Sequence, residues 1–201
     1  MPLIINHIIL VLLWGLFGIL HSLLAAGWWK QIMQRWLGTH YKYYHFSYSV
    51  FAALSLTGVL IFQYSVESPL LYTVPVCVKL VLCLPALVGL LIMGVVIKKY
   101  FFSLSGISVF YKQQPPVVLE QGGMHRYVRH PLYFGTLLFI WSLFLIYPYL
   151  NNGLACFVIT VYTVLGARLE EKKLVAQFGQ KYVTYKKQVP MLIPGLFPTS
   201  G

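Results

Sequence analysis

The chain has 201 residues, of which 59% are hydrophobic and only 9% are charged, whereas soluble domains carry about 25% charged residues. This composition excludes an ordinary soluble domain and indicates an integral membrane protein. The formal net charge of +11 arises from 15 Lys and Arg residues set against four acids. Because the cations punctuate apolar stretches and do not gather on a soluble element, the charge does not indicate a nucleic-acid-binding protein.

Five apolar segments are candidates to cross a bilayer, which takes about 20 apolar residues per helix. They cover residues 3–26, 45–64, 71–97, 131–147 and 153–169. The first has no basic leader and is too long for the apolar part of a signal peptide, so we expect it to remain as a membrane helix. The last two are short and closely spaced, which predicts an antiparallel hairpin. The sequence thus predicts an all-α polytopic membrane protein with about five transmembrane helices.

The distribution of cations predicts the orientation of these spans. Fourteen of the 15 Lys and Arg residues fall in the first loop, the third loop and the C-terminal tail, and the exception is Lys79. Five spans place those three regions on one side of the membrane. Since cytoplasmic loops carry the excess of Lys and Arg, the N-terminus is expected outside and the C-terminus in the cytoplasm.

Two groups of polar or reactive residues lie inside apolar runs. Cys77, Cys83 and Cys156 have no paired spacing, so they are expected to act as small packing residues. The pair His21-Ser22 in the first span fits either an interhelical hydrogen bond or a role facing a substrate. Both interpretations of this pair stay open from sequence alone.

Several motif classes are missing from the sequence. There is no Walker pattern, no G-x-G-x-x-G after a predicted strand and no H-E-x-x-H. His125 and His130 are five residues apart and lack a third plausible ligand. We therefore expect neither a nucleotide-hydrolysing site nor a metal site.

A polar cluster borders the fourth span and reads Arg129-His130-Pro131-Leu132-Tyr133-Phe134-Gly135. Proline suits the first position of a helix, so His130 is expected at the N-cap. The N–H groups of Leu132 and Tyr133 would then be available to an anion, and Gly135 would permit close approach by a helix or a ligand. The plainer alternative is a helix start flanked by interfacial anchors.

The acids Glu170 and Glu171 end the fifth span, and the helical pattern continues to Gly179. Adjacent residues on a helix point about 100° apart, so only one of the two acids is expected to face inward. A carboxylate there suits ribose hydroxyls or an ammonium group. Alternatively, both acids pair with neighbouring Lys and Arg residues on a solvated helix end.

Three aromatic residues follow at spacings of four and three: Phe178, Tyr182 and Tyr185. On one helix they would form a single stripe. Such a stripe fits an amphipathic helix on the membrane surface, or the wall of a pocket that attracts a sulfonium through cation–π contacts.

In this order, the motifs resemble the isoprenylcysteine carboxyl methyltransferase and phospholipid methyltransferase superfamily over about residues 122–198. The resemblance rests on Tyr127-Val128-Arg129-His130-Pro131-Leu132-Tyr133-Phe134-Gly135, Glu170-Glu171, Phe178-Gly179-x-x-Tyr182-x-x-Tyr185 and Val189-Pro190-x-x-x-Pro194. Within the superfamily, the chain looks most similar to bacterial methanethiol S-methyltransferases. The resemblance implies a membrane enzyme that uses S-adenosylmethionine and releases S-adenosylhomocysteine.

The resemblance also implies that the chain consists of two functional parts. Residues 1–100 would form a three-span N-terminal part, and residues 101–201 would form the catalytic part. The expected cofactor-binding residues are His130, Pro131, Leu132, Tyr133, Gly135, Glu170, Glu171, Tyr182 and Tyr185. The expected catalytic residues are Arg129, His130, Tyr133 and Glu171, with Arg129 toward the methyl acceptor.

A small or lipophilic thiol is the favoured acceptor, because a nearby Arg129 or His130 would favour the reactive thiolate. The carboxylate of an isoprenylcysteine-like acceptor and the amine of a phospholipid remain alternatives. Two alternatives belong to other functional classes: a non-enzymatic membrane scaffold or carrier, and a membrane reductase that binds NADPH. We expect the bilayer and the acceptor as partners, and a bacterial inner membrane with the site facing the cytoplasm as the location.

Overall fold

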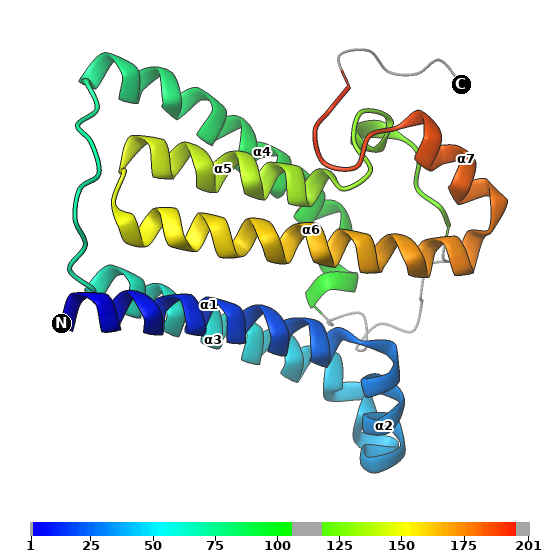
Figure 1. The fold of residues 1–201 in the computed structure, drawn as a ribbon. Coiled ribbons are helices and arrows are strands. Elements are labelled where there is room, and N and C mark those ends of the chain that lie inside the picture. The colour runs from blue at the N-terminus through cyan, green and yellow to red at the C-terminus, as the bar shows by residue number, and fades with distance from the viewer. Residues whose placement is uncertain (1, 106–117, 196–201) are drawn as a thin grey trace. The chain divides into compact units, whose positions relative to one another are not determined.

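The computed structural model describes residues 2–105 and 118–195, and within them the secondary structure is helical apart from one isolated antiparallel bridge between Leu70 and Tyr149. In chain order, the elements are α1 (Pro2–Ala25), α2 (Gly27–Leu37), the 3-10 helix η1 (Gly38–Tyr43), α3 (Tyr44–Ser65), α4 (Val76–Ser105), the 3-10 helix η3 (Gly123–Arg126), α5 (Pro131–Ile146), α6 (Leu150–Phe178) and α7 (Gln180–Gln188) (Figure 1). The predicted all-α class is confirmed.

Four helical stretches are long and apolar enough to cross a membrane: Leu3–Ala25, Gly27–Ser65, Val76–Tyr100 and Leu150–Phe178. The helix α5 is apolar too, but with 16 residues it is shorter. The chain is therefore a polytopic helical membrane protein, as predicted, while the count of five spans and the orientation stay predictions.

Both ends of α4 differ from the expected ones, and its last residue is Ser105 and not one near residue 97. The helix α4 begins at Val76 and not near residue 71, because Pro75 disfavours a helical conformation for the residue that precedes it. The helix α6 continues past the apolar span to Phe178, as the helical pattern up to Gly179 predicted, since the polar residues of its last turns are good helix formers. Gly179, with a φ of 55°, ends this helix as predicted.

The chain divides into two compact units. The first holds residues 1–73, 99–115 and 148–159, and the second holds residues 74–98, 116–147 and 160–201. The helix α4 thus belongs mainly to the second unit, and the start of α6 belongs to the first. This grouping differs from a cut at residue 100, and the functional division expected there stays a prediction.

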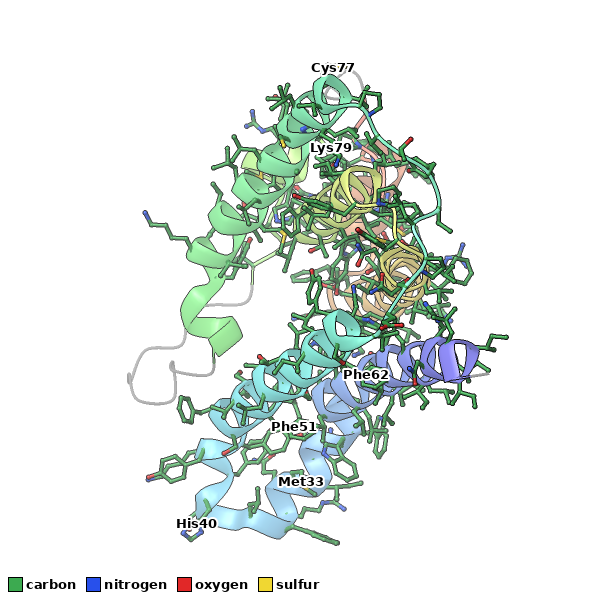
Figure 2. All side chains as sticks on the ribbon, turned by 90° about the vertical axis from the view of Figure 1, so that its left-hand side faces the viewer. Met33, His40, Phe51, Phe62, Cys77 and Lys79 are labelled. Carbon is green, nitrogen blue, oxygen red and sulfur yellow. The ribbon has the colours of Figure 1, made fainter. Side chains whose placement is uncertain are left out.

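In the first unit, α1 and α3 lie side by side (Figure 1). Their shared core contains Leu10, Trp14 and Val59, together with Ala155 from the start of α6. Figure 2 labels Phe51 and Phe62, which both lie on α3. Apolar packing therefore joins these three segments of the chain.

A hydrogen-bond network crosses this core. Trp14 Nε1 donates to Gln63 Oε1 at 2.9 Å, and Gln63 Nε2 donates to Asn152 Oδ1 at 3.0 Å. Asn151 Nδ2 donates to the Gln63 carbonyl at 2.9 Å. Buried polar groups need such partners, and this network fixes the start of α6 against α3.

His21 of α1 lies 2.9 Å from the hydroxyl of Tyr48 on α3, through its Nδ1 atom. The structure thus supports an interhelical hydrogen bond for this residue. Of the three cysteines, Cys156 is buried as expected, whereas Cys77 and Cys83 are exposed on α4. The packing role expected for the latter two was wrong, because apolar context alone does not say which face of a helix is buried.

In the second unit, α4 and α5 approach each other at Gly89 and Gly135. A Cβ atom at Gly89 would lie 2.7 Å from the Gly135 carbonyl oxygen, and one at Gly135 would lie 2.9 Å from the Gly89 carbonyl oxygen. Only glycine permits this contact on both sides. Near the start of α4, where Figure 2 labels Cys77 and Lys79, the Lys79 ammonium lies 5.6 Å from the centre of the Tyr147 ring. The single cation outside the three basic regions is therefore paired with an aromatic ring.

Candidate active site

The segment before α5 runs beside the segment that follows α7. The N–H of Arg129 donates to the Pro190 carbonyl at 2.9 Å, and the N–H of His130 donates to the Met191 carbonyl at 3.2 Å. His130 occupies the N-cap and Pro131 the first turn of α5, as predicted. These two backbone bonds hold residues 61 positions apart in sequence next to each other, so the motifs around α5 and α7 form one site.

At the centre of the site is a buried carboxylate, Glu171, which is 3% exposed. Its Oε1 atom accepts a hydrogen bond from Arg129 Nε at 2.6 Å and lies 2.6 Å from Arg129 Nη2. Its Oε2 atom lies 2.9 Å from the Lys186 ammonium. Both oxygens therefore have cationic partners, and charge-assisted bonds of this kind are the strong ones.

Arg129 makes further contacts with the end of α7. Its Nη1 atom donates to the carbonyl of Lys186 at 2.8 Å and also to the carbonyl of Val189. The last carbonyls of a helix have no partner within the helix, and here a guanidinium supplies one. The contacts thus hold Arg129 against Glu171 and α7, and the orientation toward the acceptor that the resemblance implied stays a prediction.

The neighbouring acid, Glu170, has a different environment. Its side chain is 48% exposed, and its Oε2 atom accepts a hydrogen bond from the Tyr133 hydroxyl at 3.2 Å. The Nδ1 atom of His130 lies 3.5 Å from the same oxygen. As expected from their spacing on a helix, only Glu171 faces inward, and Glu170 keeps room for another ligand.

The imidazole of His130 is 6% exposed and stacks on the Tyr133 ring, with the ring centres 5.4 Å apart. Burial lowers the pKa of His130, although Glu170 and Glu171 oppose that effect. Its Nε2 atom lies 3.5 Å from Glu171 Oε1, yet it has no hydrogen-bond partner among the residues that the structure describes. The Nε2 atom is therefore a buried nitrogen that can accept a further hydrogen-bond partner.

On α7, Tyr182 and Tyr185 are both buried and pack edge to face. The Tyr185 hydroxyl donates to the His125 carbonyl at 2.6 Å. The Tyr182 hydroxyl has no hydrogen-bond partner within the described parts of the chain. Burial raises the pKa of Tyr182, and the negative charge of Glu171 raises it further. This hydroxyl therefore stays protonated at neutral pH.

The predicted aromatic stripe does not lie on one helix. Phe178 ends α6, Gly179 interrupts the helical conformation, and the two tyrosines lie on the next helix, α7. Phe178 nevertheless packs against the cluster of Tyr182, Tyr185 and Val189. The three aromatic residues therefore share one core, on two helices.

The structure also places the remaining candidates. Pro131 and Gly135 are buried in α5, and Leu132 is half-buried. Gly135 faces Gly89 of α4, so the close approach that its small size permits is that of a helix. The roles of Pro131, Leu132 and Gly135 in holding a cofactor stay predictions.

Lys186 is a site residue that sequence reasoning missed. Its position 15 residues after Glu171 carries no spacing signal, because Gly179 ends the helix between the two residues. Only the turn at Gly179 brings α7 back toward the end of α6 (Figure 1). No local sequence signal could have separated Lys186 from its neighbour Lys187.

The site combines groups that fit a zwitterionic ligand. Glu170 offers a half-exposed carboxylate for an ammonium group or for ribose hydroxyls. The first turn of α5 presents backbone N–H groups, which suit a carboxylate. His130 Nε2 and the Tyr182 hydroxyl are buried polar atoms that a ligand could satisfy. Within the described residues, no group of three His, Cys, Asp or Glu side chains gathers in a way that could hold a metal ion.

Comparison with known proteins identifies a family whose model matches this chain. Residues 76–181 match the model of the phospholipid methyltransferase family. Methanethiol S-methyltransferase 1 of Bradyrhizobium diazoefficiens is 30% identical over 200 residues, which cover 93% of this chain and 66% of that protein. The methanethiol S-methyltransferase of Crocosphaera subtropica is 39% identical over 100 residues, which cover 46% of this chain and 38% of that protein.

A eukaryotic protein matches too. The protein-S-isoprenylcysteine O-methyltransferase of Schizosaccharomyces pombe is 35% identical over 86 residues, which cover 41% of this chain and 36% of that protein. The matched regions thus span between about a third and two thirds of the lengths of these three relatives. No solved structure matches significantly.

Proposed function

Because the chain belongs to the phospholipid methyltransferase family, we propose that it is a membrane methyltransferase that transfers a methyl group from S-adenosylmethionine to a small thiol. Several relatives are named methanethiol S-methyltransferase, which supports a thiol as the acceptor. Family membership also agrees with the resemblance predicted from the motifs. It favours an enzyme over a membrane scaffold or a reductase.

One observation carries the cofactor proposal: two buried polar atoms, His130 Nε2 and the Tyr182 hydroxyl, have no hydrogen-bond partner within the described residues, and Glu170 beside them is half exposed. We assign Glu170 to the ammonium or ribose of the cofactor and the first turn of α5 to its carboxylate. When bound, S-adenosylmethionine supplies a methyl group on a sulfonium. His130 and Tyr133 would orient the ligand through their stacked rings.

The protein's contribution to methyl transfer is alignment and exclusion of water. An in-line displacement needs no covalent intermediate, and correct positioning alone lowers a barrier by several kcal/mol. Glu171, Arg129 and Lys186 supply this rigidity, since they join α6, α7 and the segment before α5 through one buried carboxylate. In this proposal Glu171 and Arg129 position the site, and Glu170 touches the ligand.

A neutral His130 is suited to promote loss of the acceptor proton. A thiol has an ordinary pKa of about 8.5, and the thiolate is the reactive form. Because burial lowers the pKa of His130, its ring is unprotonated at pH 7 and can accept a proton. The distribution of cations supports a site on the cytoplasmic side of the membrane, and the bacterial relatives support a bacterial inner membrane.

A second acceptor class has support of its own. The yeast relative is named for an isoprenylcysteine acceptor, and the family is named for phospholipids. A carboxylate or a phospholipid amine is therefore the runner-up to the thiol.

The test uses the full chain in lipid nanodiscs with methyl-labelled S-adenosylmethionine. Methanethiol, longer alkyl thiols, a prenylcysteine analogue and phosphatidylethanolamine are offered separately. Label in dimethyl sulfide supports the thiol proposal, and label only in the prenylcysteine ester or the phospholipid overturns it. If calorimetry detects no S-adenosylmethionine binding, the cofactor assignment is wrong.

A further inference from the structure

A short amphipathic element follows the first membrane helix. None of the residues of α2 (Gly27–Leu37) or of the adjoining η1 (Gly38–Tyr43) is buried. On α2, Trp28, Ile32 and Trp36 recur every four residues and therefore share one side. Trp28 is 55% exposed and Trp36 is 81% exposed. Within the described residues, this side of α2 thus displays two largely exposed tryptophans, and Ile32 between them is half-buried.

The opposite side of α2 is polar. At 100° per residue, Lys30, Gln34, Gln31 and Arg35 fall on the arc that lacks tryptophan. A helix with a tryptophan-rich side and a cationic side has the pattern of one that lies in the plane of a membrane surface.

Its place in the chain puts α2 at such a surface. It joins α1 and α3, and both of these belong to stretches long and apolar enough to cross a membrane. The chain leaves the line of α1 at Ala26, whose extended backbone (φ −66°, ψ 140°) separates the two helices (Figure 1). Figure 2 shows Met33 and His40 on this connection, beyond the part of α3 that carries Phe51.

The charge of the element has one sign. Lys30, Arg35 and Lys42 are its formal charges, and the first acid of the chain is Glu67. The Lys42 ammonium lies 4.9 Å from the centre of the Tyr43 ring, so an aromatic ring and not a carboxylate faces this cation. A surface with three cations and no acid is complementary to anionic headgroups.

We propose that α2 and η1 form a surface element that binds anionic phospholipid headgroups. Trp28, Ile32 and Trp36 insert at the boundary between headgroups and acyl chains, where tryptophan is favoured. Lys30, Arg35 and Lys42 contact the phosphates. The element fixes the depth of α1 and α3 in the bilayer and recruits anionic lipid around the first unit. This assignment does not depend on the proposed enzymatic activity.

The test compares two variants of the full chain with the same change in charge. One carries Lys30→Gln, Arg35→Gln and Lys42→Gln, and the matched control carries Lys172→Gln, Lys173→Gln and Lys187→Gln in exposed positions of the tail. Each variant is placed in nanodiscs that contain phosphatidylglycerol and phosphatidylcholine. The protein is then released from the nanodisc, and native mass spectrometry counts the lipids of each kind that stay bound to it. A cation near an anionic surface contributes about a fivefold gain in affinity.

The first variant is expected to lose at least about fivefold of its preference for phosphatidylglycerol, while the control keeps its preference. Equal loss in both variants would mean that only net charge matters and would overturn the proposal. An unchanged preference in the first variant would overturn it as well.

Insertion is tested separately through Trp36. Brominated phosphatidylcholine is expected to quench less emission in Trp36→Phe than in the unsubstituted chain, because one bilayer-inserted tryptophan has been removed. If aqueous iodide and not the brominated lipid quenches the Trp36 contribution, the helix does not lie in the membrane surface. Thermal unfolding in detergent shows whether each variant is folded, so a misfolded protein is not mistaken for a negative result.

Discussion

The ammonium of Lys186 lies 2.9 Å from Oε2 of Glu171, so a residue of α7 neutralises the same buried carboxylate that Arg129 neutralises from the segment before α5. One side chain of α6 thereby joins two segments that are far apart in sequence. Breaking a buried ion pair by removal of one partner is costly. The relationship gives Glu171 a positioning role and leaves Glu170 as the acid with room for a ligand.

Lys186→Met is expected to weaken S-adenosylmethionine binding about fivefold without abolishing turnover at saturating cofactor. Its side chain is 48% exposed, so the bond contributes only about 1 kcal/mol. Calorimetry gives the affinity and steady-state assays separate kcat from KM. The control Lys187→Met changes an adjacent exposed cation, and Lys186→Arg should restore most of the affinity. Equal effects at both lysines would contradict a specific role for Lys186.

The two adjacent acids are expected to respond differently to the same substitution. Glu171→Gln leaves the guanidinium of Arg129 buried without its counter-charge, so the free energy of unfolding should fall by about 3–5 kcal/mol. Glu170→Gln removes a half-exposed charge, so stability should change by less than about 1 kcal/mol while cofactor binding weakens. Thermal unfolding in detergent, with and without S-adenosylmethionine, measures both effects. A reversed pattern would exchange the roles of the two acids.

The two tyrosines of α7 provide another matched pair. The Tyr185 hydroxyl has a protein acceptor at 2.6 Å, so Tyr185→Phe should destabilise the apo protein by about 1 kcal/mol. Tyr182→Phe removes a hydroxyl that has no partner within the described residues, so apo stability should not fall. If that hydroxyl binds the cofactor, Tyr182→Phe should instead lower the thermal shift that S-adenosylmethionine produces. An unchanged shift would remove Tyr182 from the site.

The crossing of α4 and α5 predicts a strong effect of a single methyl group. A Cβ atom at Gly89 would meet the backbone of Gly135 and Phe139 at 2.7 and 2.8 Å, and backbone atoms cannot move aside without shifting a helix. Gly89→Ala should therefore cost about 1–3 kcal/mol of stability. Gly94→Ala on the same helix has no neighbour within 4 Å and should be neutral or stabilising by up to about 1 kcal/mol. Equal unfolding temperatures for the two variants would contradict the close contact.

Local chemistry made much of the fold predictable. The apolar lengths predicted α1, α3 and α5 to within one or two residues, and Pro131 fixed the start of α5. The ends of α4 were less predictable. The hydropathy of residues 71–75 hid the non-helical segment that precedes Val76.

The site was only partly predictable, because its motifs are local but its contacts are not. Helical spacing alone indicated that one of Glu170 and Glu171 faces inward. That Arg129 binds the end of α7 depends on the turn at Gly179, which places α7 where no spacing rule reaches. The substitution Arg129→Ala is a poor test of catalysis, because it would also leave the carboxylate of Glu171 buried without its main partner.

The pH dependence of stability should contain a contribution from His130 of known sign. Burial lowers the pKa of this group in the folded protein, whereas an unfolded chain has a histidine pKa of about 6.5. The unfolded state therefore binds the proton more readily, and stability falls as pH decreases through about 6.5 toward the folded pKa. Above about 6.5 the contribution is constant. His130→Gln should flatten the stability profile below about pH 6.5, measured as unfolding temperature in detergent. Comparison of the two profiles removes the contributions of the other histidines, and a profile equally steep in the variant would show that His130 is not the group responsible.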